Sequence, residues 1–313
     1  MGYLTHYGEW AKPRAYSQIS ARKEPEMAIV HHRYASVGGH QLFYREAGPS
    51  DAPTVVLLHG YPSSSFMFRD LIPIIAERYR VIAPDHLGFG LSDAPSAEQF
   101  DYSFESLSNL TAALLEQLGV ERYGIYVHDY GAPIGWRLAV AQPSAITSIV
   151  TQSGNGYQDG FDEAFWQPVW AYSSEQTKEN EAVIRTALAF ESIKWQYLTG
   201  VPDPSVVAPE TWSHDFDLVS RPGNDRIQLA LNRDYVNNMS FYPKLHEYLR
   251  ASEVPVLAVW GEGDPIFRPA GARAFAKDSP GAEVHLLPGG HFLLESALHD
   301  VARLMMRFLG SIH

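Results

Sequence analysis

The chain has 313 residues, of which 45% are hydrophobic and 19% charged, which is enough for one large α/β domain with a substantial core. Its formal net charge of −12 and the lack of any basic run argue against a nucleic-acid or anionic-membrane partner. The chain contains no cysteine, which excludes disulfides, thiolate metal sites and cysteine nucleophiles. Because residues 1–20 and all later segments lack a long apolar run, we expect a cytoplasmic protein without a membrane anchor.

The first half of the chain is typical of strands that alternate with helices. Residues 1–28 lack a clear periodicity, and we interpret them as an N-terminal extension. Segments 29–37 and 41–46 alternate between apolar and polar residues, and Gly38-Gly39 between them predicts a hairpin turn. Further short runs are apolar on both faces, as buried parallel strands are. These runs are residues 54–58, 80–83, 123–127 and 146–151. Two more strands are expected late in the chain, over residues 255–260 and 283–287.

Helical patterns separate these strands. Phe104, Leu107, Leu110, Leu114 and Leu118 form one stripe at helical spacing, and a last helix is expected over residues 297–309. The regular alternation predicts an α/β fold with a mostly parallel sheet and helices on both faces. Residues 153–252 contain no strand-like run, so we interpret them as a helical cap inserted between two parts of the core, 29–152 and 253–313.

The strand over residues 123–127 leads into a candidate nucleophile. The sequence YGIYVHDYGAPIGW places Asp129 where G-x-S-x-G enzymes carry their serine. Small residues at Gly131 and Ala132 allow a tight turn, which would aim Asp129 out of the carboxyl edge of the sheet, where such sheets bind ligands. An exposed aspartate that caps the following helix is the alternative interpretation.

Two further patterns end neighbouring strands. In LLHGYPSSSF, the turn after residue 58 can aim the backbone N–H of Tyr61 at a developing oxyanion, together with the N–H of Tyr130. Asp264 follows the strand over 255–260, and His291 follows the next strand, 27 residues later. Since the chain order of nucleophile, acid and histidine matches hydrolase triads, we predict a triad of Asp129, Asp264 and His291.

Together the motifs HGYP, DHLGFGLSD, HDYGAPIG, GEGDPIF and GGHF resemble the α/β-hydrolase superfamily over nearly the whole chain from Ile29. The aspartate nucleophile is similar to that of the branch with epoxide hydrolases and haloalkane dehalogenases. The resemblance implies Asp129 as nucleophile, His291 as general base and Asp264 as its orienting acid. Some relatives carry the acid after an earlier strand, but residues 153–155 are Ser-Gly-Asn here, which favours Asp264.

An aspartate suits attack on a saturated carbon. A carboxylate with a pKa near 4 is already ionised at neutral pH and needs no base. It would form a covalent ester between Asp129 and the substrate, and water activated by His291 would hydrolyse that ester. An ester substrate would not need this arrangement, which argues against a simple esterase.

The choice between epoxide and halide depends on the donors around the leaving group. Haloalkane dehalogenases carry a tryptophan directly after the nucleophile and often an asparagine in the H-G-x-P turn, where this chain has Tyr130 and Tyr61. Fluoroacetate-specific relatives carry an arginine after the nucleophile, which is also absent. A cap tryptophan, Trp166, Trp170 or Trp195, could still supply one donor.

Epoxide hydrolases instead use two cap tyrosines as acids. Tyr235 lies 29 residues before Asp264, similar to the second of these tyrosines, and Tyr157 or Tyr172 are candidates for the first. The chain has 17 tyrosines, so packing is the alternative role for each of them. We therefore predict an epoxide hydrolase, with a haloalkane dehalogenase as the first alternative.

Other functions stay open as alternatives, namely an esterase or lactonase of the same fold, or a small-molecule binding protein without turnover. We expect no cofactor and no metal, since adjacent His31 and His32 in a strand face opposite ways. The expected partners are water and a small, apolar organic substrate that fits an aromatic cap. The oligomeric state is open, and a homodimer in which residues 1–28 pack on a partner subunit is one option.

Overall fold

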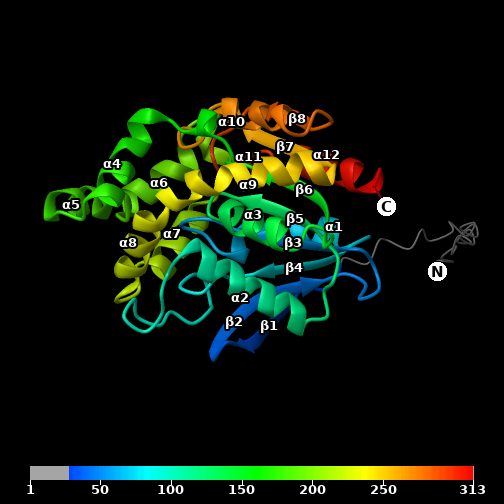
Figure 1. The fold of residues 1–313 in the computed structure, drawn as a ribbon, viewed down its shortest axis with the longest axis horizontal. Coiled ribbons are helices and arrows are strands. Elements are labelled where there is room, and N and C mark those ends of the chain that lie inside the picture. Colours follow the sequence, from blue (N-terminus) through cyan, green and yellow to red (C-terminus); the bar gives the residue numbers. More distant parts are fainter. Residues whose placement is uncertain (1–27, 313) are drawn as a thin grey trace, which may run out of the picture.

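The computed structural model describes residues 28–312, which form one eight-stranded sheet with helices around it (Figure 1). The strands lie in the order β1-β2-β4-β3-β5-β6-β7-β8. The pairs β1–β2 and β2–β4 are antiparallel, and all other neighbours are parallel. The strands are β1 (His31–Val37), β2 (His40–Ala47), β3 (Thr54–Leu58), β4 (Arg80–Pro84), β5 (Tyr123–His128), β6 (Ile146–Gln152), β7 (Val256–Gly261) and β8 (Glu283–Leu287). The predicted extension, residues 1–28, lies outside the described residues except for Ala28.

The central strands are apolar because helices cover both of their faces. Every residue of β5 and β7 is buried, as expected for parallel strands inside such a sheet. The predicted α/β fold is therefore confirmed. The hairpin turn is confirmed as well, since Gly38 and Gly39 both adopt positive φ angles, +58° and +86°, between β1 and β2.

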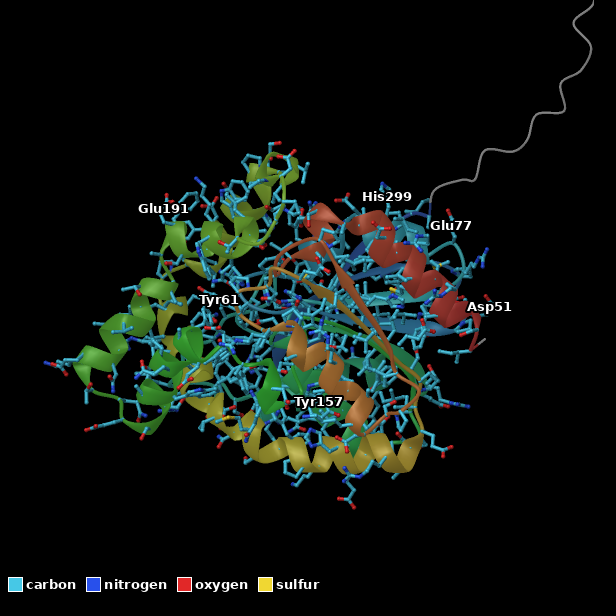
Figure 2. All side chains as sticks on the ribbon, turned by 90° about the horizontal axis from the view of Figure 1, so that it is seen from above. Asp51, Tyr61, Glu77, Tyr157, Glu191 and His299 are labelled. Carbon is cyan, nitrogen blue, oxygen red and sulfur yellow. The ribbon has the colours of Figure 1, made fainter. Side chains whose placement is uncertain are left out.

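Helices cover the sheet on two sides. Figure 2 shows α12 and α9 on opposite sides of the strands.

The ends of α2 show how the sequence sets the bounds of a helix. At its start, the Ser103 side chain accepts a hydrogen bond from the Ser106 N–H at 3.1 Å, and after its end Gly119 adopts a φ of +68°. The helices are α1 (Leu71–Ile75), α2 (Phe104–Gln117), α3 (Gly131–Ala141), α4 (Glu163–Ser174), α5 (Lys178–Ala187), α6 (Phe190–Leu198), α7 (Pro209–Val219), α8 (Asn224–Asp234), α9 (Val236–Ser252), α10 (Pro269–Ala274), α11 (Leu293–Ser296) and α12 (Leu298–Gly310).

The six helices α4 to α9 form the insertion between β6 and β7. Helices α4 to α8 gather at one end of the sheet, on the left of Figure 1. By contrast, α9 runs back along the sheet and packs against α3, so the last helix of the insertion belongs to the layer that covers the core. No helix within residues 28–312 combines the length and apolar character that crossing a membrane requires.

Candidate active site

Asp129 stands at a sharp bend between β5 and α3. Its φ angle is +47°, a left-handed conformation that is strained for a residue with a side chain. The bend leaves no room for a side chain two residues later, because a Cβ on Gly131 would lie 2.1 Å from the carbonyl oxygen of Leu58. These constraints fix the direction in which the Asp129 carboxylate leaves the sheet, at the end of a strand that is buried throughout.

The Asp129 carboxylate accepts hydrogen bonds from the backbone. Its Oδ1 accepts the Tyr61 N–H at 2.7 Å, and the N–H of Tyr130 also donates to the carboxylate. The Tyr61 N–H can reach the Asp129 carboxylate because β3 pairs with β5 in a register that places Leu58 next to Val127. The structure thus places both predicted oxyanion donors at one carboxylate.

A pair of histidines holds the loop that carries Tyr61. The N–H of His86 donates to His59 Nε2 at 3.0 Å, and His86 Nε2 lies 2.9 Å from the carbonyl oxygen of His59. Both rings are buried, with their centroids 4.2 Å apart. Hydrogen bonds between His59 and His86 therefore join the HGYP and DHLG segments beneath the site.

His291 lies between the two aspartates. Its Nδ1 is 3.1 Å from Asp264 Oδ2, and its Nε2 is 4.0 Å from Asp129 Oδ2. The N–H groups of Ile266 and Phe267 donate to Asp264 Oδ1 at 2.9 and 3.0 Å, which orients that carboxylate toward the imidazole. The sequence placed these three residues at three strand ends, and the structure brings all three together.

Burial and neighbouring charges shift the pKa values of Asp129 and His291. Burial raises the pKa of Asp129 to about 6, against the opposing effects of His291 and of the two backbone donors. For His291, burial lowers the pKa, but the charge and hydrogen bond of Asp264, with a further contribution from Asp129, raise it overall. At neutral pH, Asp129 is therefore mostly ionised and acts as an anion.

The end of β6 carries no carboxylate, and it contributes a supporting residue that the sequence analysis missed. Gln152 Nε2 donates to the carbonyl oxygen of His291 at 2.7 Å, and the Tyr126 hydroxyl donates to Gln152 Oε1 at 3.0 Å. This chain of hydrogen bonds fixes the backbone of the loop that carries His291. A glutamine at the end of a buried strand is the signal that could have identified it.

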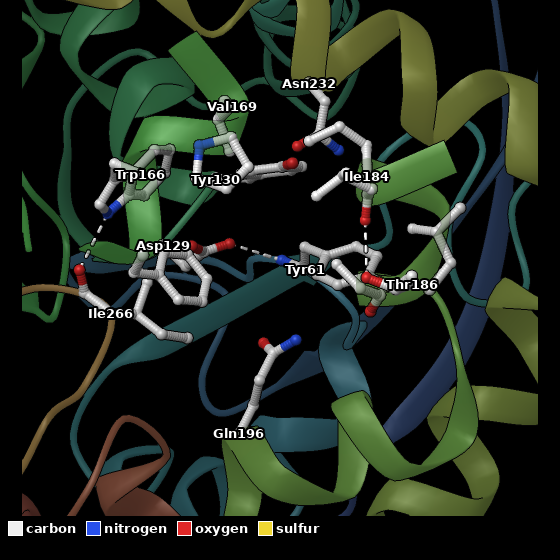
Figure 3. Close-up of a pocket in the computed structure, with 15 residues that line it drawn as sticks. Tyr61, Asp129, Tyr130, Trp166, Val169, Ile184, Thr186, Gln196, Asn232 and Ile266 are labelled. Carbon is white, nitrogen blue, oxygen red and sulfur yellow. Dashed lines mark hydrogen bonds between the residues drawn. The ribbon is translucent and has the colours of Figure 1, made fainter. Parts of the chain in front are cut away.

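A cavity of about 160 Å³ opens above Asp129 (Figure 3). Its wall is mostly apolar and is shared between the core and helices α4, α5, α6 and α8 of the insertion. A volume of this size suits an organic molecule about as large as benzene. The lining residues are Tyr61, Asp129, Tyr130, Phe165, Trp166, Pro168, Val169, Val183, Ile184, Thr186, Ala187, Leu188, Gln196, Asn232 and Ile266.

The candidate residues of the cap lie at different distances from this cavity. Trp166 lines it, but its Nε1–H donates to the carbonyl oxygen of Ile266 at 2.9 Å. Tyr235 lies one layer behind the wall, with its ring centroid 4.4 Å from that of Trp166 and 5.9 Å from that of Tyr130. Unlike Tyr235, Tyr130 lines the cavity, and its ring carries a hydroxyl. The sequence had drawn attention only to the backbone N–H of Tyr130.

The structure does not bring Tyr157 or Tyr172 to the cavity wall. The Tyr157 hydroxyl donates to Asp278 Oδ2 at 3.1 Å, and its ring stacks on that of His246 with the centroids 4.2 Å apart. Tyr172 is buried in α4 but is not among the lining residues. Neither tyrosine lines the cavity, so this arrangement does not support either of them as the acid at the leaving group. No group of three or more metal-binding side chains comes together within residues 28–312.

Residues 53–298 match the profile of the alpha/beta hydrolase fold family. An uncharacterized hydrolase of Saccharomyces cerevisiae is 40% identical over 87% of this chain and 94% of its own length. A cis-3-alkyl-4-alkyloxetan-2-one decarboxylase of Shewanella oneidensis is 28% identical over 88% of this chain and 87% of its own length. A haloalkane dehalogenase of Psychrobacter cryohalolentis is 29% identical, with 86% and 87% covered.

Solved structures share the fold along almost the whole chain. Haloalkane dehalogenase DbeA from Bradyrhizobium elkani has a TM-score of 0.74 and 24% identity, covering 91% of this chain and 98% of its own. Epoxide hydrolase CorEH has a TM-score of 0.71 and 19% identity, covering 91% of this chain and all of its own (100%). These two likenesses show the shared fold, and the match over residues 53–298 confirms the resemblance to the α/β-hydrolase superfamily.

Proposed function

We propose that this chain, which belongs to the α/β-hydrolase fold family, is a hydrolase whose Asp129 forms a covalent ester with a saturated carbon of a small apolar substrate. One observation carries the proposal. A carboxylate, and not a hydroxyl, stands at the strained bend after β5, with Oδ1 held by the Tyr61 N–H and Oδ2 4.0 Å from His291 Nε2. A carboxylate in this position attacks carbon directly.

In the first step, Asp129 Oδ2 bonds to the substrate carbon, and the leaving group departs with the electron pair of its bond to that carbon. The nucleophile must be ionised for this attack, and with a pKa of about 6 most of it is ionised at pH 7. The apolar cavity above Asp129 excludes water and brings the carbon close to the carboxylate.

In the second step, His291 Nε2 takes a proton from water, and the water oxygen bonds to the carbonyl carbon of Asp129. The resulting oxyanion forms on Oδ1, which accepts the Tyr61 N–H, and the nearby Tyr130 N–H stabilises the same negative charge. Asp264 stabilises the imidazolium. The ester bond then breaks, the alcohol leaves with the proton from His291, and the carboxylate is restored.

The cavity wall and the similar proteins favour different leaving groups. The cavity favours an epoxide oxygen, because Trp166 already spends its N–H on Ile266 while Tyr130 presents a phenol that can protonate an alkoxide. Burial, followed by the charge of Asp129, raises the pKa of Tyr130 far above its usual value, so this phenol keeps its proton. Tyr235 lies behind Tyr130 and supports its ring.

The relatives favour the second candidate, a haloalkane dehalogenase. Proteins of that name match most of this chain at 29% identity, whereas the epoxide hydrolase likeness concerns the fold alone. A halide needs no proton on departure, so any N–H or O–H donor in the wall could assist it.

The test is to trap the ester in the His291→Gln variant. This variant receives 1,2-epoxybutane, 1-bromobutane or an aryl ester, and intact-mass spectrometry followed by peptide mapping locates any adduct. We expect an adduct on Asp129 from the epoxide, and an adduct from the bromide alone would assign the halide activity instead. The Asp129→Asn/His291→Gln double variant is the control and should remain unmodified. An aryl-ester adduct on a serine would overturn the proposal.

A further inference from the structure

Gln196, on helix α6, is the cap residue whose polar group faces the cavity without a protein partner. The residue is only 5% exposed, and its side chain lines the cavity wall. Figure 3 shows its amide pointing toward Asp129 and Tyr61 from the side opposite Trp166 and Val169. Within residues 28–312, no hydrogen bond to or from this amide is present, so its donors and its acceptor are available to a ligand.

The other side-chain donors of the cap wall are already committed to backbone carbonyls. Asn232 Nδ2 donates to Gln228 at 2.9 Å, and Thr186 Oγ1 donates to Val183 at 2.6 Å. Trp166 donates to Ile266, as described above. Gln196 differs from these donors, because its amide faces the cavity and keeps its hydrogen-bonding capacity for a group bound there.

We infer that Gln196 binds the atom that leaves the substrate carbon, with Nε2 donating a hydrogen bond to the departing oxygen or halide. The inference rests on the proposed covalent step at Asp129. That step forms the bond between Oδ2 and carbon and breaks the bond between carbon and the leaving atom, which takes the electron pair. The amide transfers no proton. An alkoxide receives its proton from the Tyr130 hydroxyl, and the phenolate regains a proton when ester hydrolysis leaves a protonated Asp129 carboxyl, which ionises. A halide departs as the anion, and the proton from the Asp129 carboxyl then passes to solvent.

The chemistry of the amide suits this role beside a buried carboxylate. Asp129 carries a negative charge during attack, and this charge favours the orientation in which the N–H groups of Gln196 face inward. A lysine or arginine here would bind the carboxylate and hold it away from the carbon. A neutral donor instead stabilises the charge that develops on the leaving atom.

Neighbouring residues hold α6 against the histidine loop. The ring of Tyr197 stacks on Phe292, the residue after His291, with centroids 4.0 Å apart and planes 6° apart. The Tyr197 hydroxyl also donates to the buried Asp215 on α7. On the other side, Trp195 stacks on Phe165 of the cavity wall. Gln196 is therefore positioned relative to the catalytic residues before a substrate arrives.

The test removes the donor and keeps the volume. Adduct formation on Asp129 is timed in the His291→Gln background, with Gln196 intact or changed to Leu, for 1-chloro-, 1-bromo- and 1-iodobutane and for 1,2-epoxybutane. We expect Gln196→Leu to slow adduct formation about tenfold to a hundredfold for the epoxide and the chloride, and least for the iodide, which accepts hydrogen bonds poorly. A structural defect would slow all four substrates equally.

Asn232→Leu is the matched control, because it removes a lining amide that is already bonded to the backbone. We expect it to leave the order among leaving groups unchanged. A second readout uses His291-intact protein, where hydrolysis of the preformed ester should keep its rate in Gln196→Leu, since the leaving group has already departed.

The outcomes separate this inference from the function on which it rests. Equal adduct rates with and without Gln196, or a slowing that ignores the leaving group, would overturn the role of Gln196 alone. An absence of any adduct while Gln196 is intact would overturn the proposed function itself.

Discussion

The two halves of the site are built by different means. On the core side, backbone N–H groups and strand ends position Asp129 and Asp264. On the cap side, stacked aromatic rings position the cavity wall, such as Trp166 against Tyr235 and Tyr197 against Phe292. Backbone hydrogen bonds tolerate little variation, whereas packed rings can be exchanged for others. Under the proposed function, the core half carries out the chemical step and the cap half selects the substrate.

The largest effect is expected at the nucleophile. Asp129→Asn keeps the volume and an acceptor for the Tyr61 N–H but removes the attacking anion, so turnover should fall by at least about 10⁴-fold. Initial rates with the best substrate and the absence of a mass adduct check this result. Residual turnover above a few per cent would show that another residue attacks the substrate.

The next effect separates the two chemical steps within the core half. Asp264→Asn leaves the nucleophile intact but no longer stabilises the imidazolium, so ester hydrolysis should slow by about 10³-fold. Adduct formation should change only a few-fold, and rapid-quench mass spectrometry should find the ester accumulating in this variant. If adduct formation slowed as much as hydrolysis, Asp264 would act on Asp129 itself.

A smaller, substrate-dependent effect is expected at the boundary between the two halves. Tyr130→Phe removes the phenol from the wall, and we expect epoxide turnover to fall about a hundredfold while alkyl bromide turnover is retained. Tyr157→Phe is the control, because that hydroxyl is bonded to Asp278 away from the cavity. Equal losses in both variants would contradict the assignment of Tyr130.

The smallest effect concerns pH. Burial raises the pKa of Asp129 to about 6, so the fraction of attacking anion declines as the pH falls through 6. The single-turnover rate of adduct formation should then fall about tenfold for each further pH unit. Because His291 lowers the pKa of Asp129, the same decline should begin at higher pH in His291→Gln. A rate that stays constant down to pH 4.5 would contradict the burial effect.

The difference between the core half and the cap half of the site also explains which features the sequence could predict. Strand ends are marked by Gly, Pro and polar residues, so the positions of Asp129, Asp264 and His291 followed from the pattern along the chain. The predicted strands over 54–58 and 283–287 coincide with β3 and β8, since short runs rich in apolar residues between turn residues are typical of strands.

The cap could not be predicted in the same way, because its geometry depends on packing between helices distant in sequence. Tyr157 is a plausible cap tyrosine by position, yet its ring packs on His246 and Phe275. Gln196 carries no motif, and its place at the cavity depends on tertiary contacts of its neighbours, such as Tyr197 on Phe292 and Trp195 on Phe165. Helical periodicity indicates which face of a helix is apolar, but not which of several aromatic residues reaches the substrate.

The central claim is that Asp129 itself becomes part of the intermediate and is hydrolysed at its own carbonyl carbon. A single turnover in ¹⁸O-labelled water, with enzyme in excess over substrate, tests this directly when followed by mass spectrometry of the peptide that contains Asp129. The account predicts one heavy oxygen in the Asp129 carboxylate and an alcohol product that carries none from this turnover. Label found only in the product, with an unlabelled Asp129, would contradict it.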